Sequence, residues 1–186
     1  FSGNDWNQKD YEEYVDRSKE KLSLMERKPI KIKTGDYRTW FESAAVSDFL
    51  SMFSWNGISE ASLRQGCSGF GKMRHNDIRL SPKFSITEDF SPGYCPKFNS
   101  DGEMAPNELP LIQNGNLKNT LVSSRSAKEY GLTSNYAENG EYLRSPRMET
   151  GNLNHNDVVG KLNKGLFLSN IHYLNWSDNP GGRITG

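Results

Sequence analysis

The chain has 186 residues, of which 34% are hydrophobic, and its 23 lysine and arginine residues balance 23 aspartate and glutamate residues. This length suits one domain, or one domain with an appendage, and is enough to bury a core. A net charge of zero argues against a protein that neutralises nucleic-acid phosphates or is drawn to an anionic membrane surface. No apolar run approaches the length of a membrane span. The two cysteines, Cys67 and Cys95, form no CxxC pair, which favours a cytoplasmic location.

The first predicted element is an amphipathic helix over residues 8–28. Apolar residues recur there at helical spacing among charged ones, at Tyr11, Tyr14, Val15, Leu22 and Met25. Pro29 ends this helix, because proline cannot continue it. We therefore predict an N-terminal helical segment over residues 1–29 and a separate domain over residues 30–186.

Short strands and helices are predicted next. Ile30 and Ile32 begin one strand, and residues 37–41 form another. Ser43 can cap a helix over AAVSDFLSMFS, whose inner face would hold Ala45, Phe49, Leu50 and Phe53. A short helix is expected over residues 59–66.

After residue 66 the chain changes to short β-like runs, such as residues 77–81 and 83–90, separated by glycine and proline. The clearest local signal is Asn114-Gly115 between two apolar segments, which favours a tight hairpin turn with positive φ. A short helix over residues 126–131 and a helix near residues 155–165 follow, and the second leads into a strand over residues 166–176. Because no regular alternation of strand and helix occurs, we predict an α+β fold with a mostly antiparallel, curved sheet and a few short helices.

No metal or nucleophile motif is complete in the sequence. The histidines are His75, His155 and His172, and none lies within five positions of another, so a zinc site would need convergence in space. Cys67 lies in a loop of small residues with Lys72 close by. A reactive thiol there is one interpretation, and a small structural residue is the simpler one.

The stretch LFLSNIHYLNWSD, residues 166–178, ends in aromatics, amides and an acid. Alternation along a strand places Tyr173 and Asn175 on one face and Trp176 and Asp178 on the other. The pattern alone favours an ordinary strand end with half-buried aromatics. The alternative is the wall of a peptide-sized groove, in which Asn175 and Asp178 would satisfy backbone groups of a bound peptide.

The order of several segments resembles the C-terminal domain of the TldD/PmbA family, metallopeptidases also called modulators of DNA gyrase. These segments are the NG hairpin, then LVSSRSAKEYG, then RMETGNL, then a strand that begins KGLF, and the ending NIHYLNWSDNPGGRITG. The resemblance covers roughly residues 30–186 and implies that family's α+β fold. Family members continue into further strands at the point that matches GRITG, so the resemblance also implies a chain truncated at its C-terminus.

The resemblance does not carry over the family's zinc ligands. Catalytic subunits have an HExxxH motif on a helix early in this domain and a cysteine ligand near their C-terminus. The corresponding segment, Ala44–Ser62, has no histidine, and Glu60 is its only glutamate. The cysteine would fall beyond Gly186. The sequence thus resembles the metal-free PmbA/TldE-type branch, for which no metal ligand, catalytic residue or cofactor is expected in this chain.

By this resemblance, the chain binds and helps to process peptides as a subunit of a cytoplasmic peptidase complex. Its partner would be a TldD-type subunit or a second copy, zinc would belong to the partner subunit only, and the substrate would be an unfolded or extended peptide that adds to a sheet. Neither nucleic acid nor a membrane is an expected partner. The candidate substrate-binding residues are Tyr173, Asn175, Trp176, Asp178 and Arg183.

Two other functions remain open from the sequence. One is an active metallopeptidase with an atypical site that includes His172 and Asp178 or His75. The other is a protein-interaction domain without enzymatic activity.

Overall fold

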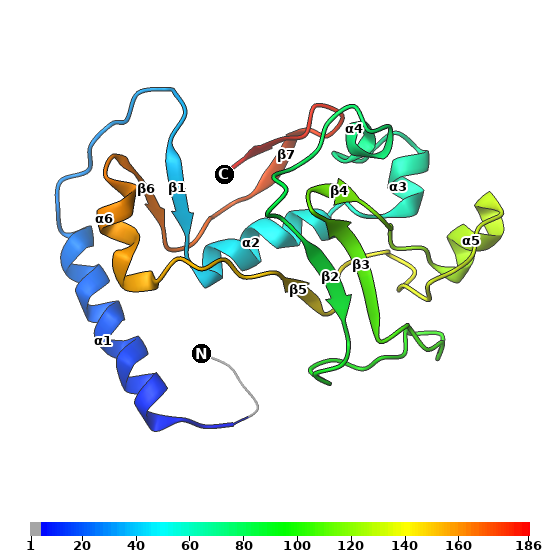
Figure 1. Cartoon of the computed structure of the whole chain (residues 1–186), viewed down its shortest axis with the longest axis horizontal. Helices are drawn as coiled ribbons and strands as arrows, with labels where there is room; N and C mark the ends of the chain where they lie inside the picture. The colour runs from blue at the N-terminus through cyan, green and yellow to red at the C-terminus, as the bar shows by residue number, and fades with distance from the viewer. Residues whose placement is uncertain (1–4) are drawn as a thin grey trace. The chain divides into compact units, whose positions relative to one another are not determined.

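The computed structural model describes residues 5–186 and divides into two compact units, one that ends at Asp36 and one over Tyr37–Gly186 (Figure 1). In the first unit, helix α1, Gln8–Met25, begins where the Asn7 side chain accepts hydrogen bonds from the backbone N–H groups of Lys9 and Asp10. None of its residues is buried. The strand predicted at Ile30 and Ile32 was wrong, because both residues lie in irregular chain and are exposed.

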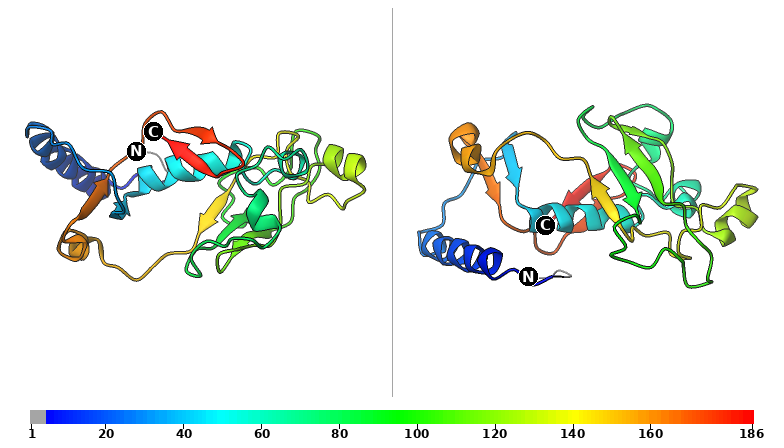
Figure 2. Two further views of the ribbon diagram at one scale, coloured as in Figure 1. Left: turned by 90° about the horizontal axis from the view of Figure 1, so that it is seen from above. Right: turned by 60° about the horizontal axis from the view of Figure 1, so that its bottom comes forward.

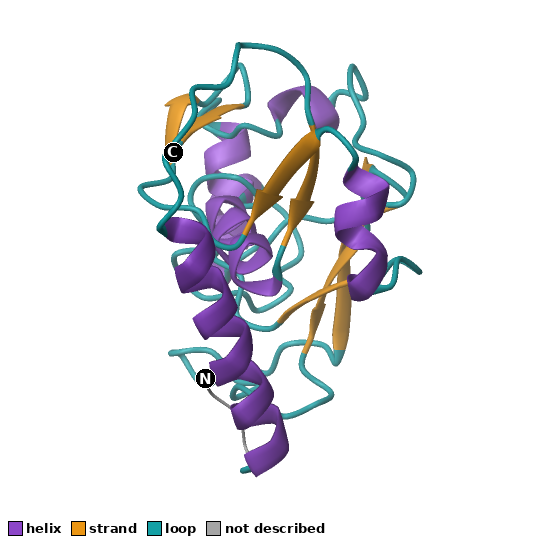
Figure 3. Ribbon diagram, turned by 90° about the vertical axis from the view of Figure 1, so that its left-hand side faces the viewer, coloured by secondary structure: helices purple, strands orange, loops and turns teal. Residues whose placement is uncertain are grey.

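The second unit contains the remaining elements, and Figure 3 separates its strands from its helices. In chain order they are β1 Arg38–Phe41, α2 Ser43–Ser54, α3 Glu60–Arg64, α4 Gly71–Arg74, β2 Ile86–Asp89, β3 Glu108–Gln113, β4 Asn116–Leu117, α5 Ser124–Tyr130, β5 Pro146–Met148, a 3-10 turn His155–Asp157, α6 Val158–Leu162, β6 Gly165–Leu168, β7 Asn175–Asp178 and β8 Arg183–Thr185. No helix within residues 5–186 is both long and apolar enough to cross a bilayer.

The strands form one larger sheet and two ribbons. The sheet has the order β4-β3-β2-β5 and is antiparallel throughout. The ribbon β7–β8 is also antiparallel, whereas β1 and β6 form the parallel pair. The predicted α+β fold with mostly antiparallel strands is therefore confirmed.

The hairpin predicted at Asn114-Gly115 is confirmed as the turn between β3 and β4. Asn114 has φ 50° and Gly115 has φ 79°, the left-handed values that such a turn requires. A side chain at Gly115 would meet the carbonyl oxygen of Leu80. The turn is held by two backbone hydrogen bonds of 2.9 Å, from the N–H of Gly115 to Phe84 and from the N–H of Leu80 to Gly115.

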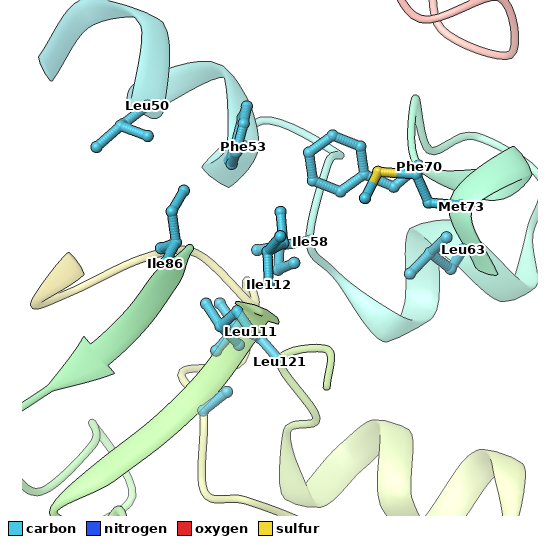
Figure 4. Packing of buried hydrophobic residues seen from close by; sticks show 11 residues of the cluster. Leu50, Phe53, Ile58, Leu63, Phe70, Met73, Ile86, Leu111, Ile112 and Leu121 are labelled. Atoms are coloured by element: carbon cyan, nitrogen blue, oxygen red, sulfur yellow. The ribbon is translucent and has the colours of Figure 1, made fainter. Parts of the chain in front are cut away.

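The core lies where α2 covers the sheet. Leu50 and Phe53 of α2 are buried together with Ile86 of β2 and Ile112 of β3 (Figure 4). The ring of Phe53 packs edge-on against Phe70, with ring centroids 4.8 Å apart. The inner face predicted for α2 is confirmed at Ala45, Leu50 and Phe53, which are buried. The predicted cap was wrong, because Ser43 is the first residue of the helix and Glu42 is its cap residue.

The single strand predicted over residues 166–176 was wrong, because the segment is divided between two ribbons. Its first part, β6, pairs with β1, and its last part, β7, pairs with β8. Between them the chain leaves the extended conformation, since Tyr173 has φ 54° and the N–H of Ile171 donates to the carboxylate of Asp48 at 3.0 Å. The break places the ribbon β7–β8 on the side of α2 opposite to the sheet (Figure 2).

Candidate functional site

Two grooves flank α2. The first, here the edge groove, lies between α2 and the edge strand β5 and has a volume of about 450 Å³. The second, here the hairpin groove, lies between α2, α4 and the ribbon β7–β8 and has a volume of about 390 Å³. Both volumes fall in the range of about 300–1,000 Å³ that is usual for ligand sites.

The edge groove has an unpaired backbone along one side. The N–H of Asp89 donates to Ser145 at 2.9 Å and the N–H of Glu149 donates to Ser85 at 3.1 Å, so Ser145 and Glu149 face β2. By the alternation of an antiparallel ladder, the N–H and C=O of Met148 then point away from β2. Because β5 is the last strand of the sheet and no other described strand pairs with it, these groups are open to a further strand.

The walls of the edge groove are apolar or carry hydroxyl groups, and no charged residue is among its described lining residues. The lining residues are Ser43, Val46, Ser47, Leu50, Ser51, Ser54, Leu143, Pro146 and Met148. Ser54 accepts a hydrogen bond from the N–H of Leu143 at 3.0 Å, which ties the chain before β5 to the end of α2. A neutral groove of this kind distinguishes little between ligands of different charge.

The hairpin groove exists because the ribbon β7–β8 is docked beside α2. The indole N–H of Trp176 donates to the carbonyl of Trp55 at 2.6 Å, and the side-chain amide of Asn179 donates to the carbonyl of Cys67 at 2.9 Å. The Trp176 ring also lies over Gly69, where a Cβ atom would be only 2.8 Å from the ring. Glycine at that position thus permits the close approach.

The hairpin groove is mostly apolar, and Lys72 is the only charged residue among its described lining residues. The lining residues are Phe49, Phe53, Gly69, Phe70, Lys72, Met73, Ile78, Leu80, Ser81, Phe84, Trp176, Pro180, Gly181, Gly182 and Ile184. Its aromatic walls come from α2, from the loops on either side of α4 and from Trp176 of β7.

The structure brings some of the predicted site residues to the hairpin groove and leaves others outside both grooves. Trp176 lines the hairpin groove. Asp178 and Arg183 form an ion pair of 2.7 Å across the hairpin, and this bond, with the N–H of Gly181, lowers the pKa of Asp178. Tyr173, which is 86% exposed, and Asn175, also exposed, line neither groove. Asp178 and Arg183 therefore shape the ribbon rather than the groove wall.

Sequence reasoning missed the opposite walls of both grooves. Phe49 and Phe70 in the hairpin groove, and Val46 and Met148 in the edge groove, were not predicted as site residues. A signal was present in α2, because apolar residues occur there on more than one face of the helix.

Glu60 does not have the chemistry of a metal ligand or a catalytic base. Its carboxylate is 1% exposed and accepts two hydrogen bonds from the guanidinium of Arg74, at 2.7 and 2.9 Å. Arg64 donates to it at 2.8 Å and the hydroxyl of Thr120 at 2.7 Å. Burial alone raises the pKa of Glu60, but the hydrogen bonds from Arg74, Arg64 and Thr120 outweigh burial and lower the pKa to about 2.

The histidines do not assemble into a metal site with other ligands. His75 follows the last residue of α4, the ring of His155 lies 6.1 Å from that of Trp40, and the ring of His172 lies 4.4 Å from that of Tyr173. Within residues 5–186 no group of three or more His, Cys, Asp or Glu side chains could hold a metal ion. The described residues thus do not fit a zinc site.

Comparisons with known proteins agree with this fold. Residues 34–186 match the family of the PmbA/TldA metallopeptidase C-terminal domain. A protein of Bacteroides thetaiotaomicron named as a candidate modulator of DNA gyrase is similar in structure, with a TM-score of 0.67 and 16% identity over 91% of this chain and 41% of that chain. A candidate modulator of DNA gyrase from Thermotoga maritima is also similar in structure, with a TM-score of 0.63. The two are 17% identical over 84% of this chain and 40% of that chain. The chain thus spans about 40% of the length of these proteins. A search of curated proteins gave no match.

Proposed function

The chain belongs to the family of the PmbA/TldA metallopeptidase C-terminal domain, and on that premise we propose that it binds unfolded peptides for a peptidase complex. The peptide adds as an extended strand to β5 and lies in the edge groove. The complex is cytoplasmic, consistent with Cys67 and Cys95, which are free thiols.

The observation that carries this proposal is the open edge of β5. The N–H and C=O of Met148 point away from β2, beside a groove lined by Val46, Leu50 and Leu143. An added strand would satisfy these backbone groups and bury alternate side chains in the groove. Because main-chain hydrogen bonds do not depend on side-chain identity, such a site accepts many unfolded sequences.

Hydrolysis of the peptide is assigned to a partner. The family description names a metallopeptidase, but the described residues offer no set of zinc ligands, and the carboxylate of Glu60 is held by two arginines. A TldD-type subunit would supply the metal, and this chain would supply binding and orientation of the substrate. A second copy of this chain is the alternative partner for assembly, but it would not supply the metal for hydrolysis.

The main-chain contact can be tested at Met148 with two matched variants. Met148→Ala and Met148→Pro both remove the side chain, but only proline removes the N–H that points away from β2. Since that N–H is not part of the ladder to β2, proline is tolerated at this edge position. Circular dichroism and thermal melting would establish that both variants fold alike.

Binding is measured by fluorescence anisotropy with a labelled, unstructured peptide of about ten residues, long enough to cover one strand. We expect Met148→Pro to bind about threefold to tenfold more weakly than Met148→Ala, the effect of one lost hydrogen bond. Equal binding by the two folded variants, or no binding by the unaltered chain, would contradict the proposal.

A further inference from the structure

The hairpin groove has features that the proposed strand binding at β5 does not use. Its walls are aromatic and aliphatic, from Phe49, Phe70, Phe84 and Trp176, and its volume of about 390 Å³ leaves space between them. The ribbon β7–β8, which forms one of its walls, lies on the side of α2 opposite to β5 (Figure 2). A bulky apolar group would be removed from water in this space.

The charge at the groove is positive. Lys72 lines it and forms no salt bridge with any residue among 5–186. Asp178, the nearest carboxylate on the ribbon, is already paired with Arg183 at 2.7 Å, and Lys72 acts on it only through space. Lys72 is therefore the one charged group among the groove's described lining residues, and an anionic group on the ligand would complement it.

We infer that the hairpin groove binds the C-terminal residue of a peptide, with a large apolar side chain between the aromatic walls and the terminal carboxylate beside Lys72. The inference rests on the proposed function for the class of ligand, since a subunit that captures unfolded peptides also meets their ends. An internal residue of a peptide has an apolar side chain but no charge of its own for Lys72. Among apolar anions, a peptide end is favoured over a fatty acid by the peptidase family of the chain.

Three labelled pentapeptides that share their first four residues test both halves of the inference. The first ends in phenylalanine with a free carboxylate, the second ends in phenylalanine amide, and the third ends in serine with a free carboxylate. We expect the first to bind about threefold to fivefold more tightly than the amide, the size of an exposed ion pair. We expect it to bind about tenfold more tightly than the serine peptide, because the phenyl ring is buried.

Two variants, each with a matched control variant, locate the binding. Lys72→Met should abolish the difference between acid and amide, whereas Lys128→Met on α5, outside both grooves, should preserve it. Ile78→Glu places a charge on an exposed part of the groove wall and should weaken binding of the phenylalanine peptides. Val159→Glu, an equally drastic change at an exposed position of α6, should not.

The outcomes separate this inference from the proposed function. If the acid and the amide bind equally, and Ile78→Glu has no effect while Met148→Pro still weakens binding, the inference fails and the proposed function stands. If none of the peptides binds, both fail. If a fatty acid such as laurate binds with dependence on Lys72 and the peptide acids do not, the groove is an apolar-anion site and the inference is overturned.

Discussion

Replacement of Glu141 tests the junction between α3 and α5. This glutamate is 1% exposed and joins the starts of two helices through its two carboxylate oxygens. One oxygen accepts from the hydroxyl of Ser59 at 2.6 Å and from the N–H of Ala61 at 2.9 Å, at the start of α3. The other accepts from the N–H of Ser123 at 2.9 Å and from its hydroxyl at 3.1 Å, at the start of α5.

The variant Glu141→Gln keeps the shape of the side chain but replaces one oxygen by an NH2 group. Whichever way the amide turns, one helix start loses its acceptor and a buried backbone N–H loses its partner, at a cost of about 1–3 kcal/mol. The remaining bonds lose the charge that strengthens them, which adds roughly 1–2 kcal/mol. We therefore expect the free energy of unfolding to fall by about 2–5 kcal/mol, and Tm to fall by roughly 10 °C.

The pH dependence of this effect has a definite sign. Burial raises the pKa of Glu141, but hydrogen bonds outweigh burial and lower the pKa below its ordinary value of 4.5. The donors are the hydroxyls of Ser126 and Ser59 and the N–H groups of Ala61 and Ser123. A carboxylate whose pKa is lowered by folding stabilises the folded state above its unfolded pKa. The difference between the unaltered chain and Glu141→Gln should thus be complete at pH 7 and shrink as the pH falls below about 4.5.

Urea unfolding followed by tryptophan fluorescence at pH 7 and pH 4 would measure this difference. Glu129→Gln provides the control, since Glu129 is exposed on α5 and its replacement should change stability by less than about 0.5 kcal/mol. A Glu141→Gln variant as stable as this control at pH 7 would refute the role of the carboxylate as a joint between α3 and α5. A difference that grows on acidification would refute the sign of the pKa change.

Three further predictions concern the turn, the metal and the ribbon. Gly115→Ala should lower Tm by several degrees more than Gly131→Ala, as measured by scanning calorimetry. Both glycines have positive φ, but only at Gly115 would a Cβ atom meet a backbone carbonyl. Elemental analysis of the dialysed chain should find far less than one zinc per molecule, whereas stoichiometric zinc that is lost in His172→Ala would show an atypical metal site. Trp176→Phe removes the hydrogen bond to the Trp55 carbonyl and should speed proteolytic cleavage in the β7–β8 turn. Cleavage of this variant at the rate of the unaltered chain would contradict docking of the ribbon through this bond.

Features governed by neighbouring residues were predictable from the sequence. The turn at Asn114-Gly115 needs positive φ, which asparagine and glycine tolerate, and the structure places both residues there. The helix before Gly131 ends in a left-handed glycine, as its sequence indicates. In these cases the residue types themselves restrict the backbone, so no distant partner has to be known.

The region after residue 165 could not be predicted in the same way, because its structure depends on distant partners. Residues 165–168 are extended because β1 pairs with them, and the chain then turns where Asp48 captures the N–H of Ile171. No local pattern in residues 166–176 identifies Asp48 as an acceptor. The predicted alternation of β7 holds only in part: Asn175 is exposed and Trp176 partly buried, but the register shifts between Trp176 and Asp178. Trp176 pairs with Ile184 and lines the hairpin groove, whereas Asp178 pairs with Arg183 and does not.

The grooves follow from an excess of apolar surface on α2. An amphipathic helix at a protein surface needs one apolar stripe, yet here Leu50 and Phe53 pack on the sheet while Val46 faces the edge groove and Phe49 the hairpin groove. If side chains of neighbouring elements filled both flanks, α2 would be a fully buried core helix. Instead about 450 and 390 Å³ remain open on its two sides. Because exposed apolar surface is typical of interaction sites, these two flanks are where we propose that peptides bind.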